Sequence, residues 1–399
     1  MKNIINIHSH LLNFDFVPDN FFKTRAPVRE FLLKHNSTRW LGYIVSVFFR
    51  TKGFLTENFL RWKLTIWVAR IITKILPGRK NDRVHELLAI LKKDIDKVAE
   101  ELIEEMKEAN IVLTTPLMMD LELASFNQKP EIPYRYQVKL ISDIALKYPW
   151  KIMPFIMFDP RRKSSAHLVK TSLEKMGFLG VKMYPPLGYD PNPFSFFNPE
   201  KVNDELKEVY EYCEKNYIPI TTHCSKHGAY SGDLIHCREL ARKFANPESW
   251  EQVLQKYPKL VINFAHFGGD DELLNLDNSN SWSNKIINLI KKYKNVYTDI
   301  AYNDKALKKE TKQEYFKVLN KLMKDSVINK KILFGTDWLM TRHTWKEKEY
   351  VKEFEMFSES KKIMFENPLK FLFPQNKLPK RIKDFYKNKP IPKWMDFLN

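Results

Sequence analysis

Short apolar segments alternate with amphipathic segments of about ten to fifteen residues from about residue 107 onward. This alternation is typical of βα units and a parallel sheet. Another short apolar segment lies at the N-terminus, so eight strands are expected: Asn3–Ile7, Ile111–Thr115, Ile152–Phe158, Leu179–Met183, Ile218–Thr222, Leu260–Ala265, Val296–Ile300 and Ile332–Gly335. The pattern predicts an α/β fold, a (β/α)8 TIM barrel, as a single domain over residues 1–399.

The segments between the strands favour helical crossovers. Expected helices are Tyr134–Tyr148, Ser164–Met176, Pro199–Asn216, Pro247–Tyr257, Trp282–Tyr293 and Thr311–Lys324. Several begin at Ser or Pro and end at Pro, Gly or Asn, as helices commonly do. An open doubly wound sheet is the alternative, but no glycine-rich phosphate-binding motif follows the first strand.

The first and second strands are separated by roughly ninety residues, far more than a barrel connection needs. We expect a helical insertion over residues 17–106, with one helix through about Ile75 and a second over about 82–108 that doubles as the first crossover. One interpretation is a cap over the barrel mouth. The alternative is contact with a membrane surface or an acidic partner through residues 23–80, since Lys63, Arg70 and Lys74 share a helix face opposite Trp67.

The formal charge of +18 is concentrated rather than spread along the chain. Residues 23–80 hold 13 Lys and Arg against only Glu30 and Glu57, while charges elsewhere roughly balance, apart from a basic tail after Lys361. An electrostatic partner would therefore meet that segment rather than the whole surface, and we expect no nucleic acid partner.

Targeting signals are weak in this sequence. The three cysteines cannot form a disulfide framework, and reduced thiols are typical of cytosolic proteins. The apolar stretch at the N-terminus is too short for a signal peptide, and no apolar run approaches the ~18 residues that span a bilayer. We expect a cytoplasmic protein.

Histidines mark the ends of several expected strands. His8 and His10 lie two residues apart at the end of the first strand, where alternate side chains face the barrel interior. Alone, such a pair is weak evidence for a metal site. His223 and His266 follow the fifth and sixth strands, however, and Asp337 follows the eighth. The carboxyl ends of barrel strands meet at one rim, so these side chains predict a site for a divalent metal.

The motifs around these residues resemble those of the amidohydrolase superfamily, in particular the amidohydrolase-related branch that includes aminocarboxymuconate-semialdehyde decarboxylase. The resemblance covers the first strand and about residues 107–370. It is carried by Asn6-Ile7-His8-Ser9-His10, Gly180-Val181-Lys182-Met183-Tyr184-Pro185, Thr222-His223-Cys224, Ala265-His266-Phe267-Gly268-Gly269, Phe334-Gly335-Thr336-Asp337-Trp338 and Glu366-Asn367-Pro368-Leu369.

The resemblance implies that His8, His10, His223 and Asp337 bind one divalent metal ion, often zinc. His266 would contact the activated water or the substrate, and Asp337 would also act as a base. These roles are chemically sensible because a bound metal lowers the pKa of water to ~7. In binuclear relatives a lysine on the fourth strand is carbamylated and bridges two metals, so Lys182 leaves a second metal open as the less favoured alternative.

Other residues near strand ends are candidates for substrate contact. Arg161, Tyr184 and Tyr189 lie in strand-end loops, and Asp299 lies near the end of the seventh strand, where it would contact the substrate or support a ligand. Lys182 is a candidate for binding a substrate carboxylate.

We expect a metal-dependent hydrolase that uses activated water to cleave a C–N or C–O bond next to a carbonyl in a small molecule. The first alternative is non-oxidative decarboxylation on the same scaffold, which a carboxylate clamp involving Arg161, Arg162 or Lys182 would favour. An alternative of another class is a non-catalytic membrane-surface binding protein on a degenerate barrel. Dimers are common in the family, so a homodimer is also an expectation.

Overall fold

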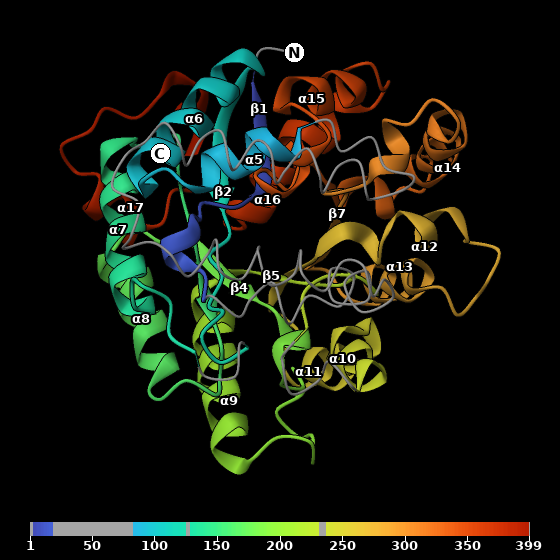
Figure 1. The fold of residues 1–399 in the computed structure, drawn as a ribbon. Coiled ribbons are helices and arrows are strands. Elements are labelled where there is room, and N and C mark those ends of the chain that lie inside the picture. The colour runs from blue at the N-terminus through green and yellow to red at the C-terminus, as the bar shows by residue number, and fades with distance from the viewer. Residues whose placement is uncertain (1–2, 19–82, 125–127, 231–236, 399) are drawn as a thin grey trace, which may run out of the picture.

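A computed structural model describes residues 3–18, 83–124, 128–230 and 237–398 (Figure 1). Eight parallel strands lie where the sequence predicts them: β1 Ile4–Ser9, β2 Ile111–Pro116, β3 Phe155–Phe158, β4 Gly180–Met183, β5 Pro219–Thr222, β6 Val261–Phe264, β7 Val296–Asp299 and β8 Ile332–Leu333. Regular pairing gives one ladder of β1 with β2 and a second that runs in chain order from β3 to β8.

Single bridges join the two ladders into a ring. Thr114 of β2 pairs with Ile152 ahead of β3, and Ser9 of β1 pairs with Trp338 after β8. The Ile7 N–H also donates to the Phe334 carbonyl at 3.1 Å. The structure is therefore the TIM barrel that the sequence predicts, with two joints held by fewer backbone hydrogen bonds than a regular ladder would give.

Helices surround this ring (Figure 1). They are α5 Val84–Leu91, α6 Ile95–Glu108, α7 Tyr134–Lys147, α8 Ser165–Lys175, α9 Glu200–Asn216, α10 Arg238–Ala245, α11 Glu251–Lys256, α12 Asp270–Leu274, α13 Trp282–Lys292, α14 Lys312–Met323, α15 Glu347–Glu355, α16 Asn367–Leu372 and α17 Lys380–Phe385. Nearly all strand residues are buried, because one set of side chains fills the barrel and the other packs under the helices.

Two strands, β3 and β8, are shorter than expected by at least two residues at one end. β3 begins at Phe155 rather than Ile152, because Pro154 has no N–H to donate to a ladder. β8 ends at Leu333 rather than Gly335, since the Phe334 N–H donates to the Ile363 carbonyl at 2.8 Å instead of to a strand. The predicted helix over Pro247–Tyr257 is likewise a 3-10 turn followed by the short α11.

The helix predicted over about 82–108 is wrong in one respect, because it is broken into α5 and α6 between Leu91 and Ile95. Asp94 is extended (φ −57°, ψ 149°), and the carbonyl of Lys93 accepts a hydrogen bond at 3.0 Å from the side chain of Asn13. A residue just after β1 thus takes the carbonyl that a continuous helix would use. α6 packs against β2, as a barrel crossover should.

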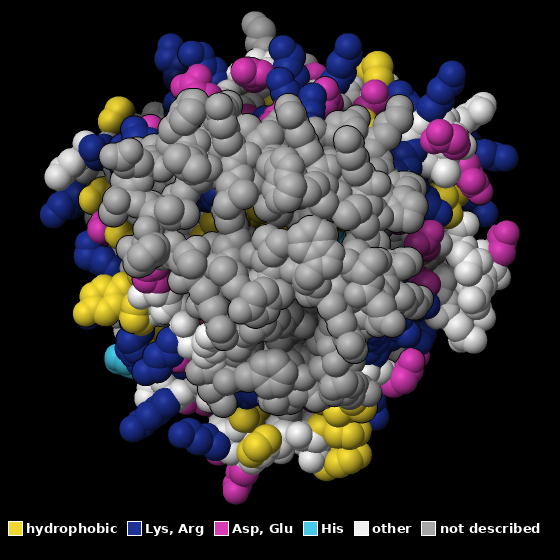
Figure 2. Space-filling model, in the orientation of Figure 1, with side chains coloured by type: hydrophobic (Ala, Val, Ile, Leu, Met, Phe, Trp, Pro, Cys, Tyr) yellow, Lys and Arg dark blue, Asp and Glu magenta, His cyan; other side chains and the backbone are white. Residues whose placement is uncertain are grey.

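Most of the predicted insertion, including its first helix and the basic segment 23–80, lies outside the described residues. Within the described residues, no helix is both long and apolar enough to cross a bilayer. Figure 2 shows Lys and Arg side chains around much of the rim of one face, interspersed with Asp and Glu.

Candidate metal centre

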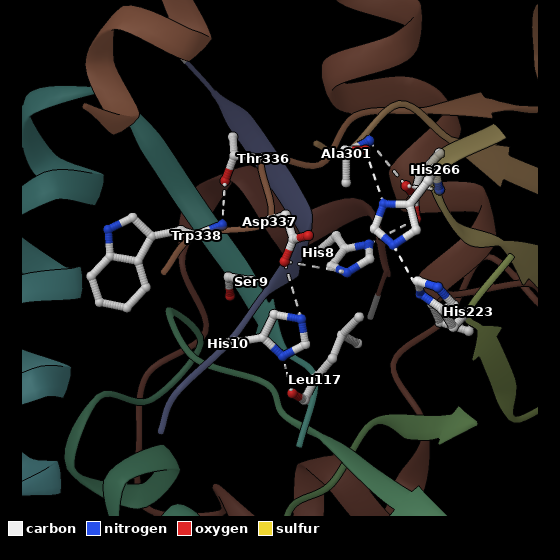
Figure 3. A network of polar contacts seen from close by, with 12 residues as sticks. His8, Ser9, His10, Leu117, His223, His266, Ala301, Thr336, Asp337 and Trp338 are labelled. Atoms are coloured by element: carbon white, nitrogen blue, oxygen red, sulfur yellow. Dashed lines mark hydrogen bonds and ion pairs between the residues drawn. The ribbon is translucent and has the colours of Figure 1, made fainter. Parts of the chain in front are cut away.

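The carboxyl ends of four strands bring the predicted side chains together (Figure 3). His8 lies in β1, His223 directly follows β5, His266 lies two residues beyond β6, and Asp337 follows β8. These four side chains and His10 are all buried. The strand ends meet at one rim of the barrel, so residues that are hundreds of positions apart share one interior space.

Asp337 lies between His8, in β1, and His10, which directly follows this strand. Its Oδ1 atom is 3.1 Å from His10 Nε2 and 3.8 Å from His8 Nε2. On the other side of His8, the Nε2 atom of His266 lies 3.2 Å from His223 Nδ1. The ring centroids of His8 and His266 are 4.8 Å apart, so the two groups form one continuous cluster.

In each histidine of the cluster, one ring nitrogen faces away from the other cluster side chains. This outer nitrogen contacts an oxygen that can only accept a hydrogen bond. The pairs are His8 Nδ1 with Asp299 Oδ2 (3.1 Å), His10 Nδ1 with the Leu117 carbonyl (2.7 Å), His223 Nε2 with the His227 carbonyl (2.8 Å) and His266 Nδ1 with the Ala301 carbonyl (3.0 Å). In the tautomer that these contacts favour, the ring proton therefore lies on the outer nitrogen.

The inner nitrogens are then lone pairs that point at other acceptors. His223 Nδ1 faces His266 Nε2, and His10 Nε2 faces the carboxylate of Asp337. His8 Nε2 is buried and has no hydrogen-bond partner in the described part of the chain. Acceptors at such distances repel unless a cation lies among them, so this donor set fits a metal ion bound by imidazole and carboxylate.

Among the described residues, His8, His266 and Asp337 form a group whose possible ligand atoms all lie within 4.8 Å of one another. His266 therefore lies as near to possible ligand atoms as the residues for which the family resemblance implies a ligand role. The structure brings all five side chains together without separating ligands from groups that contact the substrate.

Asp299 holds two of the histidines in place. Its Oδ2 atom accepts hydrogen bonds from His8 and from Asn263 (2.7 Å), and its Oδ1 atom accepts from the backbone N–H groups of His266 (2.9 Å) and Ala301 (3.0 Å). Burial alone would raise the pKa of Asp299, but these neighbours lower it below its ordinary value. Asp299 is thus a fully occupied carboxylate that orients His8.

Protonation states in the cluster suit metal binding. Burial lowers the pKa of His8 to about 4, although Asp299 and Asp337 act in the opposite direction. Burial and the neighbouring His266 lower the pKa of His223 well below its ordinary value. Burial would raise the pKa of Asp337, but His8 and His10 lower it overall. At neutral pH these groups are two neutral imidazoles and a carboxylate, the forms that bind metals.

The backbone at the site has an unusual conformation. His266 and Asp337 have φ angles of 67° and 62°, in the left-handed region that non-glycine residues rarely adopt. A Cβ on Gly335 would lie 2.6 Å from the Cβ of His8, and one on Gly228 would lie 2.9 Å from His223 Nε2. Such conformations cost free energy and gather at functional sites, where surrounding contacts hold them.

Lys182 is the one buried lysine beside the cluster among the described residues. It lies in β4 and is 1% exposed, and its Nζ atom is 5.6 Å from the centroid of the Tyr184 ring, which stacks on His223. The described residues offer it no hydrogen bond or ion pair. Burial lowers the pKa of Lys182 to about 8, although Asp337 and Asp299 act against this change.

The remaining candidates for substrate contact have other partners. Arg161 binds Asp159 through Nε at 2.9 Å and Nη2 at 2.6 Å. The hydroxyl of Tyr189 donates to the Phe158 carbonyl at 3.2 Å and accepts from the Tyr184 N–H at 3.0 Å. Tyr184 in turn accepts from the Ala229 N–H at 3.0 Å. These contacts make the two tyrosines part of the wall around His223.

One buried polar network beside the site was not predicted from the sequence. Asn6 Nδ2 donates to Thr336 (2.8 Å) and to Glu347 (2.8 Å), and Asn6 Oδ1 accepts from the N–H groups of His8 and Thr336. Burial and Glu105 raise the pKa of Glu347 to about 8. The network ties β1 to the segment that carries Asp337. A polar Asn in the middle of an apolar strand was the signal in the sequence.

Comparison with known sequences identifies the family. The sequence profile described as amidohydrolase matches residues 114–373, more than half of the chain. The chain belongs to the amidohydrolase family. This confirms the resemblance seen in the sequence motifs, and the match includes the segments that carry His223, His266 and Asp337. None of the curated proteins matches the chain.

Solved structures confirm the TIM-barrel fold of this chain. An uncharacterized TIM-barrel protein from Bordetella bronchiseptica aligns with a TM-score of 0.50 and 16% identity, over 93% of this chain and 98% of its own. The 5-carboxyvanillate decarboxylase of Sphingomonas paucimobilis gives 0.52 and 11%, over 93% and 99%. A 2,6-dihydroxybenzoate decarboxylase with bound 2,6-dihydroxybenzoate gives 0.50 and 13%, over 76% and 94%.

Proposed function

We propose that this amidohydrolase-family protein is a metal-dependent, non-oxidative decarboxylase of a small hydroxylated aromatic acid. The observation that carries the proposal is Lys182, a buried lysine beside the histidine cluster that has no hydrogen-bond or ion-pair partner in the described part of the chain. Burial of an unpaired ammonium is costly, so its retention favours a role in binding an anion. A substrate carboxylate is such an anion.

The two arginines near the site, Arg161 and Arg162, are not available to bind a substrate carboxylate. Arg161 is committed to Asp159, and Arg162 binds Asp120 through Nε at 2.6 Å and Nη2 at 2.9 Å. Both arginines therefore serve ion pairs within the protein rather than forming a clamp. This leaves Lys182 as the cation that we assign to the substrate carboxylate.

The metal would be held by His8, His10, His223 and Asp337, and we propose one divalent ion, with zinc as the first candidate. Bound there, it supplies a positive centre for the polar end of a substrate. Asp299 and the carbonyls of Leu117 and His227 keep the ligand nitrogens oriented toward it. A carbamate on Lys182, an anion that would bridge a second metal, is not needed for this arrangement.

The reaction requires a proton but no oxidant. The bond between the ring carbon and the carboxylate carbon breaks, its electron pair stays on the ring carbon, CO2 leaves, and a proton adds to that carbon. We assign the movement of this proton to Asp337 and His266, which face the same space as the proposed metal ligands. Likeness in fold to two decarboxylases supports this assignment of the reaction class.

Hydrolysis of a C–N or C–O bond next to a carbonyl is the second candidate. It is favoured by the lowered pKa of Asp337, which keeps a carboxylate base in the cluster at neutral pH. His266 would orient the water or polarise the carbonyl. The two reactions differ in the role of Lys182. Decarboxylation needs it to bind the substrate carboxylate, whereas a neutral ester or amide offers no carboxylate to bind.

The test supplies the protein with Zn²⁺, with Mn²⁺ or with no metal, and offers hydroxylated benzoic acids and their methyl esters in separate reactions. A decarboxylase releases CO2 from the free acids, and in D2O it leaves one deuterium on the vacated ring carbon. Release of methanol from the esters without CO2 from the acids would support hydrolysis instead. Absence of both products with every metal would contradict both candidates.

Lys182→Met is the matched variant, since methionine has a similar length and no charge. We expect kcat/KM for the acid to fall about 10- to 100-fold, with a larger effect on KM than on kcat, because one charged hydrogen bond is lost. Folding should be at least as stable, since a buried charge is removed. Unchanged kinetics in a folded variant would remove Lys182 from carboxylate binding.

A further inference from the structure

A second, lysine-rich site lies at the opposite end of the barrel. A cavity with a volume of about 460 Å³ opens near the amino ends of β7 and β8, and its charged walls are Lys291, Lys292, Lys294, Lys330, Lys331 and Lys370. These lysines come from the end of α13 and the turn that follows it, from the turn before β8, and from α16. The candidate metal centre lies at the carboxyl ends of the same strands, so the two sites are separate.

Among the described residues, no Asp or Glu lines this cavity. Lys291 pairs with Asp325 at 3.2 Å and Lys292 pairs with Glu251 at 2.7 Å, which neutralises two of the six ammonium groups. The other four form no ion pair with any described carboxylate. A concave surface with several uncompensated charges of one sign concentrates counter-ions of the opposite sign.

Lys331 shows that this site is built into the fold rather than formed by freely moving side chains. It is half-buried, its Nζ atom donates to the backbone carbonyl of Lys294, and the ammonium lies 4.1 Å from the centroid of the Tyr297 ring. Burial lowers the pKa of Lys331 to about 8, and Lys294, Lys370 and Lys330 lower it further in the same direction. An anion between these ammonium groups would relieve their repulsion.

We propose that this cavity binds a small polyanion through a polyphosphate chain. The lining offers lysines but no arginine. Lysine binds phosphate as a point charge, whereas planar recognition of carboxylates favours the arginine fork. A volume of about 460 Å³ lies in the range of small-molecule sites and admits several linked phosphate groups. The site is independent of the proposed decarboxylation.

The test measures binding of tripolyphosphate and of adenosine triphosphate to the full chain by calorimetry at about 0.15 M salt. The cavity variant is Lys330→Gln/Lys370→Gln. The matched control is Lys256→Gln/Lys352→Gln, which removes the same charge from exposed lysines on other helices. We expect tripolyphosphate to bind about one per chain, with affinity at least 10-fold weaker in the cavity variant and within twofold of wild type in the control.

Two outcomes would overturn the proposal: no saturable binding of either compound, or an equal loss of affinity in the cavity and control variants, which would indicate diffuse attraction to a basic surface. The two probes also identify the source of the phosphates. Tighter binding of adenosine triphosphate than of tripolyphosphate would support a nucleotide, and equal or weaker binding would support a free polyphosphate chain.

Discussion

The two ends of this barrel carry polar groups in opposite ways. At the carboxyl ends, four histidines and Asp337 are buried, and each histidine has a fixed hydrogen bond on its outer side. At the amino ends of β7 and β8, lysines surround a cavity that no described carboxylate lines. The first arrangement would suit a cation held by buried ligands, whereas the second would suit an anion held by ammonium groups that solvent reaches.

The difference has a physical basis in burial. A buried polar group that loses its partner costs about 1–3 kcal/mol, so a change at the metal centre should have a large and local effect. Charges exposed to solvent interact weakly and are screened by salt. Variants at the two ends should therefore separate by the size of their effects and by their sensitivity to ionic strength.

Asp337→Asn should have the largest effect. It replaces the carboxylate that lies 3.1 Å from His10 Nε2 with a neutral group of the same shape, so the residue that we propose as both a metal ligand and a base loses its charge. We expect turnover to fall on the order of 10³-fold or more. Circular dichroism should show a preserved fold, and a folded variant that keeps its activity would remove Asp337 from the mechanism.

Asp299→Asn should have the next largest effect. An amide has only one acceptor oxygen, so it cannot accept the four hydrogen bonds that Asp299 receives from His8, Asn263 and two backbone N–H groups. We expect metal affinity to fall about 10- to 100-fold, measured by competition with a chelating dye. Asp143→Asn, at an exposed ion pair with Lys139, is the control. Equal affinities in both variants would contradict the orienting role.

The pH dependence of substrate binding should report on Lys182. With its pKa lowered to about 8, the ammonium is charged below that pH and loses its charge above it. For a carboxylate substrate, kcat/KM should therefore fall above about pH 8, approaching tenfold per pH unit. In Lys182→Met this alkaline decrease should disappear. A decrease that persists unchanged in the variant would assign it to another group.

The cavity variant Lys330→Gln/Lys370→Gln should have the smallest effect on turnover, because the candidate metal centre lies at the opposite end of the barrel. We expect turnover within twofold of wild type. Less repulsion around Lys331 should raise the free energy of unfolding by no more than about 0.5 kcal/mol at low salt, and this gain should vanish at high salt. A large loss of activity would mean that the two ends are coupled.

The sequence predicted that the five side chains of the candidate metal centre lie together because their positions follow from periodicity. Alternating side chains in β1 place His8 and His10 on one face, and strand ends of a parallel barrel must meet, so His223 and Asp337 had to approach them. The protonated nitrogen of each ring could not be predicted, since the accepting carbonyls of Leu117, His227 and Ala301 lie in loops without a period.

Contacts between distant segments explain the other differences between the structure and the sequence-based predictions. The break between α5 and α6 depends on Asn13, eighty positions before the carbonyl that it binds. β8 is short because Ile363 takes the Phe334 N–H. The lysine cavity joins α13, the turn before β8 and α16, so only the folded chain brings its residues together. Charge counts along the sequence pointed instead to residues 23–80, which lie outside the described residues.

Metal content directly tests whether the histidine cluster binds one divalent ion. The protein is incubated with a divalent ion, desalted and analysed by mass spectrometry for metal per chain, together with His10→Ala, His223→Ala and the control His167→Ala at an exposed helix position. We expect one ion per chain in the wild type and in His167→Ala, and a marked loss of bound ion in His10→Ala and His223→Ala. No bound ion in wild type, or full occupancy in His10→Ala and His223→Ala, would contradict this expectation.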